Sequence, residues 1–87
     1  MKAFRFSVTS PEGRVFSDEI YQISVRAVDG ELAILAGHIP MMTALVPSEC
    51  RIYLTDGNMR RATVGGGILS VTPGEVSLLS SDFAWKE

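Results

Sequence analysis

Apolar and polar side chains alternate with a period of two along most of this chain. The apolar positions of the clearest runs are Phe4, Phe6 and Val8, then Tyr21, Ile23, Val25 and Ala27, then Ile52 and Leu54. Successive side chains of a strand point to opposite faces, so this pattern predicts strands with one buried and one wet face. No window of a dozen residues predicts a helix. The sole candidate is a stub that starts at Phe83 and is capped by Ser81-Asp82.

Turn residues separate the alternating runs. Asp29-Gly30 is the strongest hairpin signal in the chain. The stretches 10–13, 56–58 and 72–75 combine proline, glycine, asparagine or aspartate, which suit tight turns. Many short strands with frequent turns predict an all-β fold, a flattened antiparallel β-sandwich or barrel. We expect this domain to cover residues 1–81, with a short tail at 82–87.

Length and charge narrow the class of protein. The chain has 87 residues, enough for one domain, and a net charge of −2. Its only run of basic residues is Arg60-Arg61, which argues against nucleic-acid binding because that needs an extended basic field. The longest uncharged stretch, 32–48, is interrupted by glycine and proline and is shorter than the roughly 20 residues of a membrane span. A soluble chain that can work beside a membrane is expected.

Groups that could perform chemistry are few. His38 and Cys50 are the only residues of their kinds, which is too few for a zinc site, and no Gly-x-Ser-x-Gly motif is present. We therefore predict no catalytic residue, no metal and no cofactor. Cys50 is interpreted as a small strand residue. For His38 two interpretations stay open, a loop histidine bonded to nearby backbone or a contact to a partner protein.

Three consecutive glycines, Gly65, Gly66 and Gly67, look superficially like a phosphate-binding loop. They lack the Gly-Lys-Ser/Thr that follows in such loops, and no helix is predicted after them. A structural role is favoured, either a bulge or a close approach of backbone between sheets. Similarly, Asp29 and Glu31 are interpreted as a solvated turn and not as a cation site.

Three segments, in order and with matching spacing, resemble the epsilon subunit of F-type ATP synthases. They are Ser-Pro-Glu-Gly-Arg-Val-Phe-Ser at 10–17, Gly-Glu-Leu-Ala-Ile-Leu-Ala-Gly-His-Ile-Pro at 30–40, and Gly-Gly-Gly-Ile-Leu-Ser-Val at 65–71. The resemblance covers nearly the whole chain. It implies a flattened sandwich of about ten strands in a non-catalytic subunit of the rotating central stalk. Such a subunit binds the gamma subunit and the membrane ring of c subunits, and it couples proton flow to ATP synthesis.

The resemblance also implies positions for these contacts. The hairpin residues Asp29, Gly30, Glu31 and Leu32 would face the ring. Ser10, His38 and Thr43 would face gamma, and Gly65, Gly66 and Gly67 would be structural. A peripheral position on the cytoplasmic side of a bacterial inner membrane is expected. Family members usually continue into a C-terminal helical hairpin, whereas this chain stops at Glu87 as a natural short form or a truncated one. The alternatives are a small ligand- or peptide-binding sandwich and, less favoured, a small enzyme.

Overall fold

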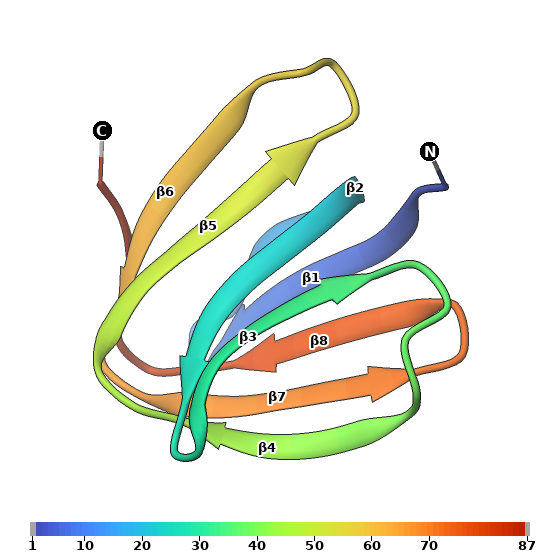
Figure 1. Ribbon diagram of the computed structural model, residues 1–87. Helices are drawn as coiled ribbons and strands as arrows, with labels where there is room; N and C mark the ends of the chain where they lie inside the picture. Colours follow the sequence, from blue (N-terminus) through green and yellow to red (C-terminus); the bar gives the residue numbers. More distant parts are fainter. Residues whose placement is uncertain (1, 87) are drawn as a thin grey trace.

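The computed structural model describes residues 2–86, and all regular structure in this part of the chain is β-strand (Figure 1). The all-β prediction is confirmed, with nine described strands where about ten were expected. The strands are β1 Phe4–Ser10, β2 Gly13–Ala27, β3 Gly30–Leu35, β4 Met41–Leu45, β5 Ser48–Leu54, β6 Met59–Val64, β7 Gly67–Thr72, β8 Glu75–Leu79 and β9 Phe83–Trp85.

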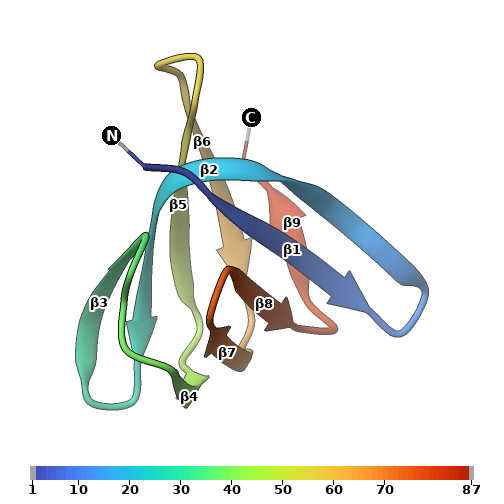
Figure 2. The same ribbon diagram turned by 90° about the vertical axis from the view of Figure 1, so that its right-hand side faces the viewer.

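The strands form two layers that share the long strand β2. Its first half pairs with β1 and its second half with β3 and β5. One layer therefore runs β3-β2-β5-β6-β9, and the other runs β2-β1-β8-β7-β4 (Figures 1 and 2). The register of β2 against β5 shifts between Ile20 and Gln22, where β2 passes from one layer to the other. An irregularity of this kind bends and twists a strand, which lets β2 serve both layers.

One strand pair departs from the antiparallel expectation. β1 and β8 run parallel, with Phe6 opposite Val76 and Val8 opposite Leu78. Parallel neighbours cannot be joined by a tight turn, and here the connection is the whole segment from β2 to β7. The alternation of apolar residues cannot reveal this, because it is the same in parallel and antiparallel strands.

The core lies between the layers and is built from the predicted apolar positions. Phe6, Val8, Ile23 and Ile52 are completely buried. Cys50 is also buried, which raises the pKa of its thiol to about 12, with a smaller contribution from Glu49. The thiol is therefore neutral at physiological pH, and the interpretation of Cys50 as a small strand residue is confirmed.

The predicted turns are confirmed, but the helix considered at Phe83 is wrong. Val28 and Asp29 join β2 to Gly30, the first residue of β3, and Gly74 in the β7–β8 turn has φ of 86°, a value that suits glycine. Phe83–Trp85 forms strand β9, which pairs with Ala62–Val64 of β6. Its aromatic rings pack on the sandwich, with the centroids of Phe16 and Trp85 5.5 Å apart. This packing decides in favour of a strand, and residues far along the chain supply it.

Candidate interaction surfaces

The four residues expected to face a membrane ring are held together by the β2–β3 hairpin. Ala27 pairs with Gly30, and Arg26 Nη2 lies 2.9 Å from Glu31 Oε2 across the two strands. Asp29 and Glu31 are exposed, whereas Leu32 is half-buried and packs against the core. The hairpin therefore carries two exposed acidic side chains.

The hairpin also exposes a residue that the sequence analysis missed. Val28 is, with Asp29, one of the two residues of the β2–β3 turn and is 62% exposed. Its backbone N–H donates to the carbonyl of Ala44, which holds this end of the hairpin against β4. An apolar residue beside a turn dipeptide is the sequence signal that could have identified it.

The three residues expected to face gamma lie at separate places in the sandwich. Ser10 ends β1, and its hydroxyl accepts from the N–H of Glu12 at 3.3 Å. His38 lies in the β3–β4 connection, with Nδ1 3.1 Å from the carbonyl oxygen of Ile39. Thr43 is half-buried in β4 and shares the inner face with Leu69, its partner in β7.

Ser10 and His38 are not brought together. His38 lines a hollow of about 220 Å³ that also includes Phe4, the first residue of β1, whereas Ser10 is the last residue of that strand. A seven-residue strand spans roughly 20 Å. These residues can contact one partner only if that partner covers the surface between them.

That surface is the outer face of the β4-β7-β8 layer, and it carries exposed apolar side chains. Met42 is 70%, Leu79 56% and Ile68 43% exposed. Ile68 pairs with both Ala44 and Leu79, and Leu79 pairs with Thr9, so these residues form one row across four strands. We call Met42, Ala44, Ile68 and Leu79 the apolar face. Its sequence signal is the adjacent apolar pairs 41–42, 68–69 and 78–79, because one member of each pair must leave the core.

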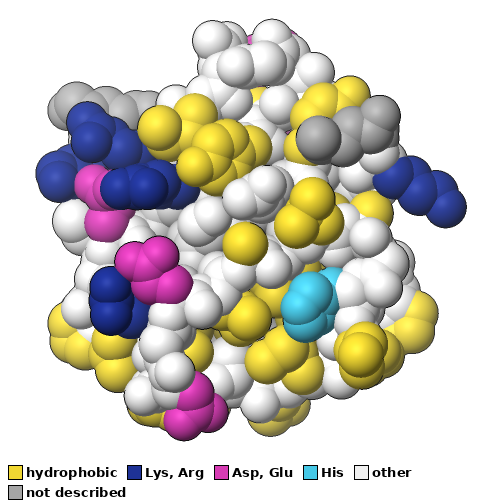
Figure 3. Space-filling model, viewed as in Figure 1, with side chains coloured by type: hydrophobic (Ala, Val, Ile, Leu, Met, Phe, Trp, Pro, Cys, Tyr) yellow, Lys and Arg dark blue, Asp and Glu magenta, His cyan; other side chains and the backbone are white. Residues whose placement is uncertain are grey.

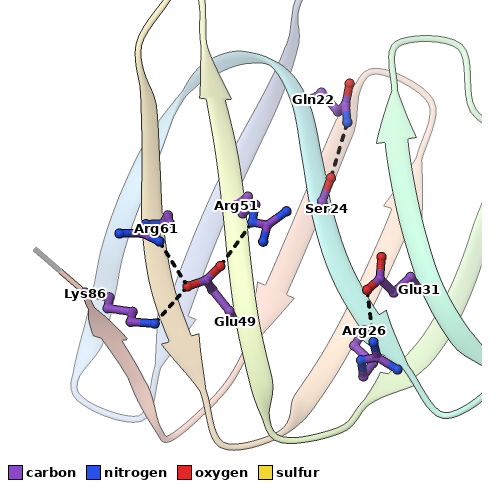
Figure 4. Close-up of polar contacts among 8 residues, drawn as sticks. All are labelled: Gln22, Ser24, Arg26, Glu31, Glu49, Arg51, Arg61 and Lys86. Atoms are coloured by element: carbon purple, nitrogen blue, oxygen red, sulfur yellow. Dashed lines mark hydrogen bonds and ion pairs between the residues drawn. The ribbon is translucent and has the colours of Figure 1, made fainter.

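The outer face of the other layer is charged. Arg26, Arg51, Arg61 and Lys86 lie there, paired with the carboxylates of Glu31 and Glu49 (Figure 4). Figure 3 shows basic and acidic side chains gathered on this side of the molecule. Glu49 Oε2 lies 3.0 Å from Lys86 Nζ, and Oε1 lies 3.0 Å from Arg51 Nε. Hydrogen bonds from Lys86 and then Arg51 lower the pKa of Glu49.

The three glycines form the tight connection from β6 to β7. A Cβ added at Gly65 would lie 2.6 Å from the Cβ of Asp82, and one at Gly67 would meet the backbone carbonyl of Leu79. Gly66 has φ of 129°. A side chain is excluded at 65 and 67 by neighbouring atoms, and at 66 it is disfavoured by the backbone conformation.

Other kinds of site find no support in residues 2–86. This part of the chain contains no group of three or more His, Cys, Asp or Glu side chains that could hold a metal ion. It also contains no helix with the length and apolar character that a membrane span requires. The half-buried aromatics Phe16, Phe83 and Trp85 pack against the core and one another, so they do not offer a stacking platform for a ligand.

Comparison with protein families identifies the domain. The family model described as ATP synthase, Delta/Epsilon chain, beta-sandwich domain, matches residues 3–86. The chain belongs to this family. It is 40% identical over 87 residues to the ATP synthase epsilon chain of Caldicellulosiruptor saccharolyticus, covering 100% of this chain and 63% of the relative. It is 34% identical over 86 residues to the sodium ion specific ATP synthase epsilon chain of Acetobacterium woodii, covering 99% and 65%.

Two solved structures share the sandwich fold. A chain in the mitochondrial ATP synthase of Euglena gracilis, an assembly of OSCP, F1 and c-ring, superposes with a TM-score of 0.90 at 20% identity, over 95% of this chain and 53% of that one. A chain of the central stalk and c-ring of Tetrahymena thermophila mitochondrial ATP synthase gives a TM-score of 0.79 at 15% identity, over 91% and 63%. At such identities the likeness shows the fold. The chain spans less than two thirds of the length of these epsilon relatives.

Proposed function

We propose that this domain is a non-catalytic part of the central stalk of an F-type ATP synthase, where it joins the gamma subunit to the ring of c subunits. The family match over residues 3–86 carries the proposal. The surface supports it, because an exposed acidic hairpin and an uncharged apolar face give the domain two chemically different places to bind. The domain would then lie peripherally, on the cytoplasmic side of a bacterial inner membrane. Coupling to proton flow stays a prediction, since one relative is named for sodium.

The apolar face is the surface that we assign to gamma. Met42, Ile68 and Leu79 are large apolar side chains that stay exposed in the isolated domain. Contiguous exposed apolar side chains are typical of protein interfaces. Ser10 adjoins this face through Thr9, the partner of Leu79, and Thr43 adjoins it through Met42. His38 lies in the loop that leads into β4. The proposed gamma contacts Ser10 and His38 therefore border the apolar face, whereas the side chain of Thr43, next to Met42 in β4, lies on the inner face with Leu69.

The β2–β3 hairpin is the part that we assign to the ring. Asp29, Gly30 and Glu31 form its exposed end with Val28, while Leu32 anchors it to the core. Both side chains of the Arg26–Glu31 ion pair are exposed, so the pair contributes little to the stability of the fold. Glu31 therefore remains available to a partner. Charges at such a contact mainly set register and specificity.

A stiff domain between the two partners can transmit torque. The core packs at the density of an organic crystal, so it resists deformation. The glycine connection Gly65–Gly66–Gly67 is proposed to be structural, since it lets β6 and β7 turn tightly against Asp82 and Leu79. The arrangement needs no cofactor.

The charge of Glu31 provides the test. In the assembled enzyme, Glu31→Lys should lower ATP-driven ion pumping by inverted membrane vesicles, while the urea midpoint of the isolated domain stays within error of wild type. Glu19→Lys is the matched control, because Glu19 is also exposed but lies in the half of β2 that pairs with β1, outside the hairpin and the apolar face. Wild-type pumping by Glu31→Lys, or equal losses in both variants, would refute the assignment of the hairpin to the ring.

A further inference from the structure

Strand β9 is the shortest strand of the sandwich and lies at an edge. Three residue pairs join it to β6, and no other described strand pairs with it. Short edge elements with few backbone partners are among the first parts of a fold to open. Side-chain contacts must therefore contribute much of what holds residues 83–86 in place.

The aromatic side of this attachment centres on Trp85. Its ring packs edge-on against Phe16 and Phe83, with centroid distances of 5.5 and 5.1 Å. The guanidinium carbon of Arg60 lies 3.6 Å from the centroid of the Trp85 ring, which is cation–π geometry. Trp85 is the only tryptophan in the chain, so its fluorescence reports on this strand alone.

Among residues 2–86, the carboxylate that contacts Lys86 on the polar side of the attachment is that of Glu49. Glu49, with 22% of its side chain exposed, is 3.0 Å from Lys86 Nζ, 3.0 Å from Arg51 Nε and 3.7 Å from Arg61 Nη1. Arg51 and Arg61 are direct partners on neighbouring strands, and the backbone N–H of Lys86 donates to the carbonyl of Arg61. Without the Glu49 charge, three cations would face one another (Figure 4).

The three cations are not held equally. Arg51 and Arg61 sit within β5 and β6, which extend several residues on either side of them. Lys86 follows a three-residue strand that pairs with β6 alone among the described strands. When the central negative charge is removed, Lys86 is therefore the cation that can move away, and β9 moves with it.

We propose that residues 83–86 form an electrostatically latched strap, with Glu49 as the latch, which detaches from β6 while the remainder of the sandwich stays folded. Detachment uncovers the backbone edge of β6 at Ala62–Val64 and the apolar surface of Phe16 and Ala62. The strap thus works as a built-in cover for a sheet edge.

The charge pattern predicts the direction in which salt changes the opening of the strap, and it predicts opposite directions in the wild type and in Glu49→Gln. An ion pair with a purely structural role does not predict this reversal. In the wild type, salt screens the attraction between Lys86 and Glu49, so the strap should open more as salt rises. In Glu49→Gln, the same salt screens repulsion among Arg51, Arg61 and Lys86, so the strap should close again. The two proteins should therefore respond to salt in opposite directions.

The test is quenching of Trp85 fluorescence by acrylamide, which is an uncharged quencher. The quenching constant is measured between about 0.05 and 1 M NaCl, and the electrostatic screening length falls to about 3 Å at the upper end of this range. We expect the quenching constant of the wild type to rise about twofold across this range. At low salt, Glu49→Gln should already be at or above the high-salt wild-type value, and its constant should fall with salt. Lys86→Gln, a change of an exposed side chain, should be intermediate and insensitive to salt.

Glu31→Gln is the control, because it breaks the Arg26–Glu31 pair on the same face without touching β9. It should behave like the wild type. The proposal is overturned if Glu49→Gln and Lys86→Gln keep the wild-type quenching constant and salt response. It is also overturned if Lys86→Gln opens Trp85 only together with the whole sandwich, as judged by amide exchange of Ile23 and Ile52 in the core.

Discussion

Truncation of Met42 to alanine is the sharpest quantitative test of the apolar face. Met42 is 70% exposed in the isolated domain, so its side chain contributes little to the core but can be buried by a partner. Fully burying a methionine is worth roughly 1.5–3 kcal/mol. Burying the exposed 70% then corresponds to about 1–2 kcal/mol, or roughly a 5- to 30-fold change in Kd.

The same substitution should leave folding almost unchanged. Exposed positions away from caps and buried networks usually shift the free energy of unfolding by less than about 0.5 kcal/mol. Met42→Ala should therefore weaken binding to purified gamma, measured by isothermal titration calorimetry, with an unaltered urea midpoint. This separation of affinity from stability is what distinguishes an interface residue from a core residue.

Met59 supplies the control for this experiment. It is 43% exposed and lies in β6, which belongs to the opposite layer. Met59→Ala should leave the affinity for gamma unchanged. The reasoning fails if Met42→Ala binds gamma as tightly as the wild type, or if Met59→Ala weakens binding to the same extent.

Three further predictions concern stability. Gly67→Ala should lower the free energy of unfolding by about 1–3 kcal/mol in urea titrations, because the new alanine Cβ meets the backbone of Leu79. An unchanged urea midpoint would contradict this contact. Phe6→Ala should cost about 3–5 kcal/mol, since the ring is completely buried, and a loss below 1 kcal/mol would show that the core is not packed as described. Lys86 and Arg51 lower the pKa of Glu49 in the folded state. The attachment that Glu49 provides is therefore fully present above the ordinary glutamate pKa of about 4.3. It is lost as the pH falls through the lowered pKa of the folded state. Acrylamide quenching of Trp85 should rise over that acidic range in the wild type and show no such step in Glu49→Gln.

Local patterns in the sequence determined the strands, the turns between them and most of the core. The period of two decides which side chains share a face, and it correctly assigned Phe6, Val8, Ile23 and Ile52 to the interior. Asp29-Gly30 and Pro73-Gly74 set turns through backbone preferences that act within four residues. The hairpin that we assign to the ring could therefore be located from sequence, since all of its residues are close in the chain.

Only the tertiary structure decided which strands are neighbours, and with them the surfaces. The parallel pairing of β1 with β8, the passage of β2 between layers and the formation of β9 all depend on residues distant in the chain. Met42, Ile68 and Leu79 become one face because three strands align, and Glu49 meets Lys86 across 37 positions of sequence. The alternation of apolar and polar residues states which way a side chain points, but it does not state which strand or residue lies opposite that side chain. The pairing that answers this minimises the apolar surface left exposed by the whole domain.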